Sequence, residues 1–99
     1  VYAPDLQTPV NGAVDQMPQT MLNWFAVTGT GMNIQYEVQL STNDAFTNPV
    51  VFPLTGVTAL DAHDLLFGNT YYWRVRAYDG EAVSDWSEIW SFSIIKTVE

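Results

Sequence analysis

The fold of this 99-residue chain is decided by the ten residues from Asn69 to Tyr78, which read NTYYWRVRAY. Apolar side chains occupy every second position: Tyr71, Trp73, Val75 and Ala77. More polar ones occupy the positions between: Tyr72, Arg74, Arg76 and Tyr78. A period of two is typical of a β-strand with one face in a core and the other in solvent. We therefore expect a strand over 69–79 in a half-buried antiparallel sheet.

The same alternation recurs along the chain, and helical periodicity does not. One face is apolar in three further runs: Leu22, Trp24 and Ala26; Ile34, Tyr36, Val38 and Leu40; Trp90, Phe92 and Ile94. Turn-forming residues separate the runs: Asn11-Gly12, Thr28-Gly29-Thr30-Gly31, Asn43-Asp44, Asn48-Pro49, Gly56, Gly68-Asn69 and Asp79-Gly80. Glycine and asparagine tolerate positive φ, so strands reverse there. The pattern predicts seven strands, near 5–10, 20–27, 33–41, 49–53, 57–63, 69–79 and 88–96.

Length and composition indicate one domain that folds alone. Ninety-nine residues match the commonest domain size, and 47% hydrophobic residues supply enough apolar surface for a single core. The chain begins at Val1 with neither a charged nor an apolar leader segment. We expect residues 1–99 to be one domain excised from a longer protein.

Charge excludes two classes of partner. Eleven acidic residues against three basic ones give a net charge of -8. Nucleic acids and anionic membranes both require clustered Lys or Arg, so neither is expected as a partner. No apolar run approaches the roughly 20 residues of a membrane span, which argues against membrane insertion. The absence of cysteine excludes disulfides and thiolate metal sites.

Several segments resemble the fibronectin type III family, and together they cover nearly the whole chain. The stretch 65–77 resembles that family's passage between its fifth and sixth strands, with Phe67 where proline is usual. Leu22-x-Trp24 resembles its second strand and Tyr36-x-Val38-x-Leu40 its third. The resemblance implies an all-β, seven-stranded antiparallel immunoglobulin-like sandwich. The runs 36–42, 71–77 and 90–93, with Phe46 between the first two, are similar to divergent bacterial members found in large surface or secreted proteins.

The resemblance also implies structural roles for particular residues. Tyr71 would be the tyrosine corner, with its ring in the core and its hydroxyl on a backbone group a few residues upstream. Trp24 would lie centrally between the sheets, which hydrophobic packing alone must join. The expected structural core is Trp24, Tyr36, Leu65, Tyr71 and Trp73.

A second group of residues follows the long strand, in the segment from Trp86 to Ser91. With one residue too many, it resembles the Trp-Ser-x-Trp-Ser box of cytokine receptors, in which arginines stack on tryptophans. We expect Trp86 to cover Arg74 and Arg76 while Trp90 turns into the core. The group is either a stabilising cation–π cluster or, less favoured, a ligand platform; the candidate binding surface is Trp86, Arg74, Arg76, Tyr72 and Tyr78.

No residue pattern predicts catalysis, a cofactor or a metal. His63 lies among Asp61, Ala62 and Asp64, but without a glycine-flanked nucleophilic serine it is interpreted as a turn residue. The acidic loop from Asp79 to Asp85 lacks the ligand spacing of an EF-hand, so a solvated loop is favoured over a cation site.

The favoured functional hypothesis is a non-catalytic spacer that orients neighbouring domains of an extracellular, secreted or cell-surface protein. The alternative is an accessory module that binds protein or carbohydrate through exposed aromatics such as Phe25 and Trp86. An enzyme is disfavoured because a small sandwich with short loops leaves little room for a pocket.

Overall fold

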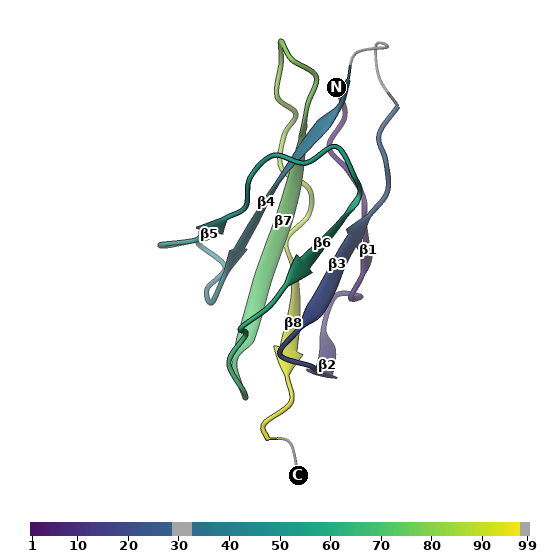
Figure 1. The fold of residues 1–99 in the computed structure, drawn as a ribbon. Helices are drawn as coiled ribbons and strands as arrows, with labels where there is room; N and C mark the ends of the chain where they lie inside the picture. The colour runs from purple at the N-terminus through teal and green to yellow at the C-terminus, as the bar shows by residue number, and fades with distance from the viewer. Residues whose placement is uncertain (29–32, 98–99) are drawn as a thin grey trace.

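The chain forms two facing β-sheets, as seen in a computed structural model that describes residues 1–28 and 33–97 (Figure 1). One sheet has the order β1-β3-β6, with β1 at Leu6–Thr8, β3 at Thr20–Trp24 and β6 at Ala59–Ala62. The other has the order β2-β8-β7-β4-β5, formed by β2 (Ala13–Gln16), β8 (Trp90–Ile94), β7 (Thr70–Tyr78), β4 (Gln35–Ser41) and β5 (Val50–Val51). The prediction of an all-β sandwich is confirmed.

All seven predicted ranges contain a strand, and an eighth strand was missed. The chain leaves the three-stranded sheet after β1 and joins the other sheet as β2, which pairs parallel to β8. Asn11-Gly12 therefore marks a change of sheet, with Gly12 at φ 83°, and not the reversal expected from its sequence. Local turn chemistry cannot distinguish the two, because the partner strand lies about 80 residues further on.

Strand ends differ from the predicted ones by at most three residues, with one consequence for the core. β3 ends at Trp24, so the alternation stops there and Ala26, predicted to face the core, is exposed. Val27 instead bends back, and its backbone N–H donates to the Tyr36 hydroxyl at 3.1 Å. The predicted turn at Gly29 to Gly31 lies outside the described residues.

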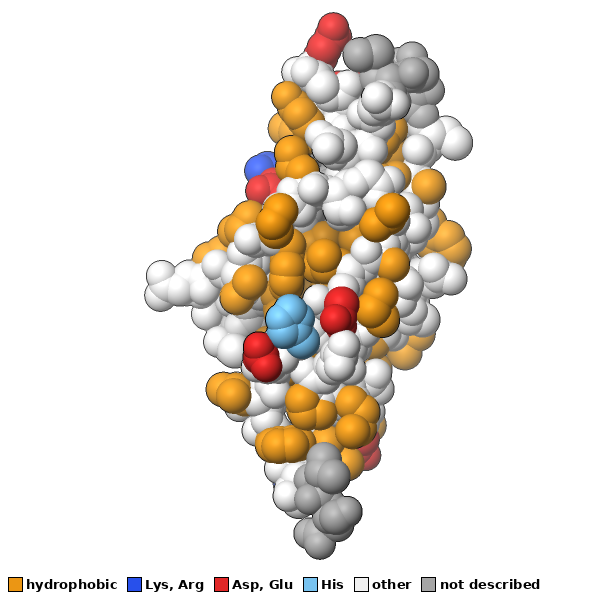
Figure 2. Space-filling model, in the orientation of Figure 1, with side chains coloured by type: hydrophobic (Ala, Val, Ile, Leu, Met, Phe, Trp, Pro, Cys, Tyr) orange, Lys and Arg blue, Asp and Glu red, His pale blue; other side chains and the backbone are white. Residues whose placement is uncertain are grey.

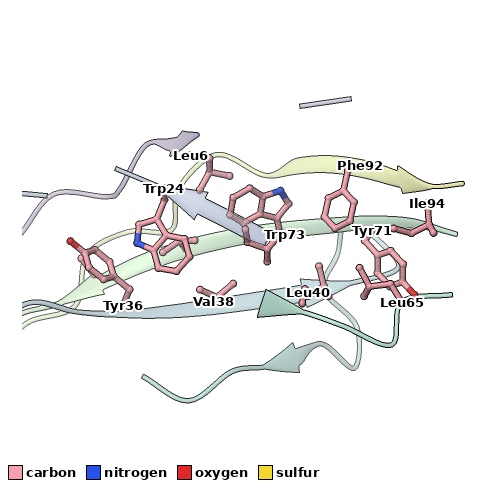
Figure 3. Packing of buried hydrophobic residues seen from close by; sticks show 14 residues of the cluster. Leu6, Trp24, Tyr36, Val38, Leu40, Leu65, Tyr71, Trp73, Phe92 and Ile94 are labelled. Atoms are coloured by element: carbon pink, nitrogen blue, oxygen red, sulfur yellow. The ribbon is translucent and has the colours of Figure 1, made fainter. Parts of the chain in front are cut away.

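The core lies between the sheets and is built from the inward faces of β3, β4, β7 and β8 (Figure 3). The expected core residues are all buried: Trp24, Tyr36, Leu65, Tyr71 and Trp73. Trp24 and Tyr36 meet edge to face with ring centroids 5.6 Å apart. Tyr71 stacks on Phe92 at 6.0 Å, and its hydroxyl accepts the Leu66 backbone N–H at 2.9 Å. That hydrogen bond is the arrangement expected of a tyrosine corner.

The sandwich is elongated, with principal extents of 48 × 23 × 20 Å. In Figure 1 the N-terminus lies at one end of the long axis, and β8 runs to the other. The described residues include no helix that is long and apolar enough to cross a bilayer.

Candidate functional site

The candidate site is a row of alternating rings and charges on the outer face of the five-stranded sheet. The Arg74 guanidinium lies between two rings, 4.1 Å from the Phe46 centroid and 4.2 Å from that of Trp86. The Arg76 guanidinium lies 4.4 Å from the Trp86 centroid and donates to Glu37 at 2.6 Å. Both arginines of the chain are therefore held on one aromatic ladder, each contact of a kind that stabilises by about 0.5–1 kcal/mol or more.

Two serines position Trp86 over the arginines. The Ser84 backbone N–H donates to the Ala77 carbonyl, and the Ser84 hydroxyl accepts the Ala77 N–H, both at 2.8 Å. Ser87 does the same with Val75, at 2.8 and 2.9 Å. Each serine thus acts toward β7 as a neighbouring strand would, although 79–89 forms no regular strand. The three-residue spacing of the serines holds Trp86 above the outward face of β7.

These serines correct the sequence interpretation of this segment. The six residues from Trp86 to Ser91 gave one residue too many for the receptor box, whereas Ser84-Asp85-Trp86-Ser87 fits its last four positions without an insertion. Val83 then stands at the position of the first tryptophan. The structure places Trp90 as expected, against the core and edge-on to Trp73 with centroids 6.4 Å apart.

Side chains of β4 bind both arginines of the ladder. Arg74 donates through Nε and Nη2 to the Gln39 side-chain oxygen at 3.0 and 2.7 Å. Partial burial and, next, the charge of Arg76 lower the pKa of Arg74, while Glu37 opposes that shift. Guanidinium groups stay charged in proteins, so the ladder keeps two cations against the Glu37 carboxylate.

A shallow hollow adjoins the ladder at its Arg76 end. It has a volume of about 380 Å³ and is lined by Glu37, Leu54, Arg76, Tyr78 and Val83. Leu54 and Val83 are exposed, so the hollow has apolar walls and an ion pair on its floor. This volume falls in the range of small-ligand sites.

The five residues predicted to form a binding surface lie on the same outer face, but they do not form a single contact cluster. Trp86 contacts both Arg74 and Arg76, Tyr78 lines the hollow, and Tyr72 lies toward the other end of β7. Phe46 and Gln39 belong to the ladder and were missed as site residues. No local signal indicates them, because Phe46 reaches Arg74 only through the fold, from a loop where its own φ is 54°.

The sequence neighbourhood of His63 and the acidic loop holds no assembled chemistry. His63 directly follows β6, is exposed, and its Nε2 lies 3.8 Å from the Asp64 carboxylate. The Asp79 carboxylate accepts the backbone N–H groups of Ala82 and Glu81 at 2.8 and 2.9 Å, which lower its pKa. Across residues 1–28 and 33–97, no three His, Asp or Glu side chains are arranged to hold a metal ion.

Solved structures with the same architecture include fibronectin type III domains. One such domain of human fibronectin type III domain containing protein 3 is 21% identical, with a TM-score of 0.72 over 96% of this chain and 86% of that one. The sixth such domain of that human protein is 14% identical, with a TM-score of 0.71 over 99% and 86%. A computationally redesigned β-sandwich is 18% identical, with a TM-score of 0.73 over 99% of both chains. Comparison with protein-family models and with curated proteins finds no match.

The chain therefore has the fibronectin type III fold, a class of antiparallel β-sandwich. Identities of 14 to 21% carry the fold alone. The bacterial character expected from the sequence stays a prediction.

Proposed function

We propose that this chain is a non-catalytic spacer that holds neighbouring domains of an extracellular protein at a set distance. The observation that carries the proposal is the shape: a sandwich 48 Å long that the chain enters at one end, with its last strand running to the other. A domain of this shape keeps its two ends at a fixed distance, because a packed core joins its two sheets.

The surface supports a spacer role. The two arginines are engaged in the ladder, and the net charge of -8 opposes self-association. Glu37 is paired with Arg76, and His63 and its neighbour Asp64 are both largely exposed, so neither group lies in an enclosed pocket suited to catalysis. An extracellular location and neighbouring domains as partners belong to the proposal.

The test measures rigidity between the two ends. Because the chain has no cysteine, a small folded domain carrying one spin-labelled cysteine can be fused at each end without a competing thiol. Pulsed electron–electron double resonance should then give one narrow distribution of distances between the two spin labels. A Gly/Ser linker of equal length serves as the control, since such chains sample a broad range of distances. A distribution as broad as that of the linker would contradict the spacer role.

A second candidate function, binding of protein or carbohydrate, is favoured by one observation, the hollow beside the ladder. Its aromatic and apolar wall, with Tyr78 above an ion pair, is a surface on which a sugar ring or an interface side chain packs. Glycan-array and pull-down screening of the wild type and of Leu54→Ala checks this. Because Leu54 is 47% exposed, its substitution should reduce capture of the ligand while leaving the melting temperature unchanged. No capture by the wild type would contradict a binding function.

A further inference from the structure

One edge of the sandwich lacks the devices that block the other three. In the described part of the chain the sheet edges are β1, β2, β5 and β6. Prolines lie on both sides of β1 and of β5: Pro4, Pro9, Pro49 and Pro53. β2 has a shifted register, with Asp15 at φ 56°. Prolines and bulges prevent a further strand from pairing with an edge.

β6 has neither device. It pairs with β3 in unbroken register from Thr20↔Ala62 to Asn23↔Ala59. Residues 54–67, which extend five residues beyond β6 in each direction along the chain, contain no proline. An edge strand that is regular and free of proline presents its outer N–H and C=O groups in the geometry that a further strand requires.

Two apolar hollows lie beside the end of β6. One, of about 350 Å³, is lined by Leu40, Val50, Phe52, His63, Asp64, Leu65 and Tyr71. The other, of about 500 Å³, shares His63, Asp64 and Leu65, continues over Leu66 and Phe67, and is closed on the β3 side by Pro18 and Gln19. Figure 2 shows the histidine of this face between two acidic side chains, with hydrophobic side chains on both sides of that row. The seam between β5 and β6 is therefore an apolar groove with polar groups at its rim.

The rim holds two carboxylates, those of Asp61 and Asp64, with His63 between them in the chain and 3.8 Å from Asp64. Gln19 donates to both carboxylate oxygens of Asp61, at 3.1 and 2.9 Å, which fixes that carboxylate next to the hollow that Gln19 lines. The Asp64 side chain is 95% exposed. None of the described residues lining the two hollows is Lys or Arg. A second copy of this chain would bring like charges together along β6, whereas a basic partner would neutralise them.

We propose that the outer edge of β6 binds an extended segment of a partner protein in which apolar and basic residues alternate. The segment adds a strand to β6 through main-chain hydrogen bonds. Because side chains of a strand alternate between its two faces, the apolar ones enter the hollow over Leu40 and Phe52 while the basic ones lie beside Asp61 and Asp64. This interaction uses a different surface from the aromatic ladder and does not depend on the spacer role.

The probe is the peptide acetyl-Lys-Val-Lys-Leu-Lys-Val-Lys-amide, titrated into the ¹⁵N-labelled chain. We expect amide shift changes along β6 and around Val50 and Leu65. The double variant Asp61→Asn/Asp64→Asn should weaken binding by about tenfold or more, because two rim charges are lost. Asparagine also tolerates the φ of 60° at position 64, so the backbone is preserved.

Matched controls separate the groove from general attraction to an acidic protein. Asp15→Asn/Asp44→Asn removes the same charge from exposed positions elsewhere and should leave affinity nearly unchanged. A peptide of the same composition with its lysines in one block tests alternation, and N-methylation of alternate peptide bonds tests main-chain pairing; both should bind much more weakly. Equal losses in the two double variants, equal binding of the block peptide, shifts confined to the Trp86 face, or no binding would each overturn the proposal.

Discussion

Single residues differ widely in how much of this fold depends on them, and Trp24 stands at one extreme. It is 1% exposed, packs on Tyr36 and bridges the two sheets without help from any disulfide. Its indole N–H has no hydrogen-bond partner among the described residues, so the side chain stabilises the core by apolar contact alone.

We expect Trp24→Ala to lower the free energy of unfolding by about 3–5 kcal/mol, a large part of the roughly 5–15 kcal/mol that a domain possesses. Circular dichroism melting and urea titration measure the loss. The control is Phe25→Ala at the adjacent position, where the ring is 52% exposed and the change should be small. Equal losses in the two variants would contradict the central position of Trp24.

Tyr71 combines a core ring with one polar contact, and the two can be separated. Tyr71→Phe keeps the ring stacked on Phe92 but removes the oxygen that accepts the Leu66 N–H. A cost of about 0.5–1.5 kcal/mol is expected, the usual net contribution of one hydrogen bond. Tyr72→Phe is the matched control, because the Tyr72 hydroxyl has no partner among residues 1–28 and 33–97. A loss no larger than that of the control would show that the tyrosine corner contributes nothing here.

Asp79 gives the residue scale a dependence on pH. Two backbone N–H groups lower the pKa of its carboxyl, so the folded chain releases this proton more readily than the unfolded chain does. The resulting stabilisation is present above the ordinary Asp pKa of about 3.9 and is lost as pH falls through the lower folded value. Acid titration should therefore show a shallower loss of stability for Asp79→Asn than for the wild type in that range. Parallel curves would refute the assignment.

At the scale of elements, the segment 79–89 replaces a strand along the upper half of β7. β8 pairs with β7 only from Thr70 to Trp73. Beyond that point, Ser84 and Ser87 supply the donors and acceptors that Ala77 and Val75 would otherwise lack. The aromatic ladder depends on this arrangement, because Trp86 lies between the two serines.

Removing either hydroxyl leaves a buried N–H of β7 without its acceptor. We expect Ser84→Ala and Ser87→Ala each to cost about 1–3 kcal/mol of folding stability. Ser93→Ala, on the outward face of β8, should cost little folding stability. Near-ultraviolet circular dichroism should also change for the two serine variants, since Trp86 loses its support. A near-ultraviolet spectrum identical to that of the wild type would show that the aromatic ladder forms without the two serine hydroxyls.

On the scale of the whole molecule, prolines lie beside two of the sheet edges, where they oppose pairing with a strand of a second copy. β5 is only two residues long, has exposed valines, and is bounded by Pro49 and Pro53. Pro49→Thr/Pro53→Thr should lengthen this edge and promote self-association, measured by sedimentation velocity over a range of concentrations. Pro18→Thr, at a position outside the edge strands, is the control. A double variant as monomeric as the wild type would contradict the edge-blocking role.

The alternation of apolar and polar residues by itself determined the sheet class, seven of the eight strands and the buried faces of β4 and β7. Those properties follow from local geometry, because a strand with one wet face must alternate. Trp86 over the two arginines was also predicted from the sequence. Only the tertiary structure decided four features: strand β2, the hydrogen bonds of Ser84 and Ser87 to β7, the ring of Phe46 in the ladder, and the groove beside β6. Each of these depends on residues far apart in the chain, and sequence order carries no information about which of them meet when two twisted sheets close on one another.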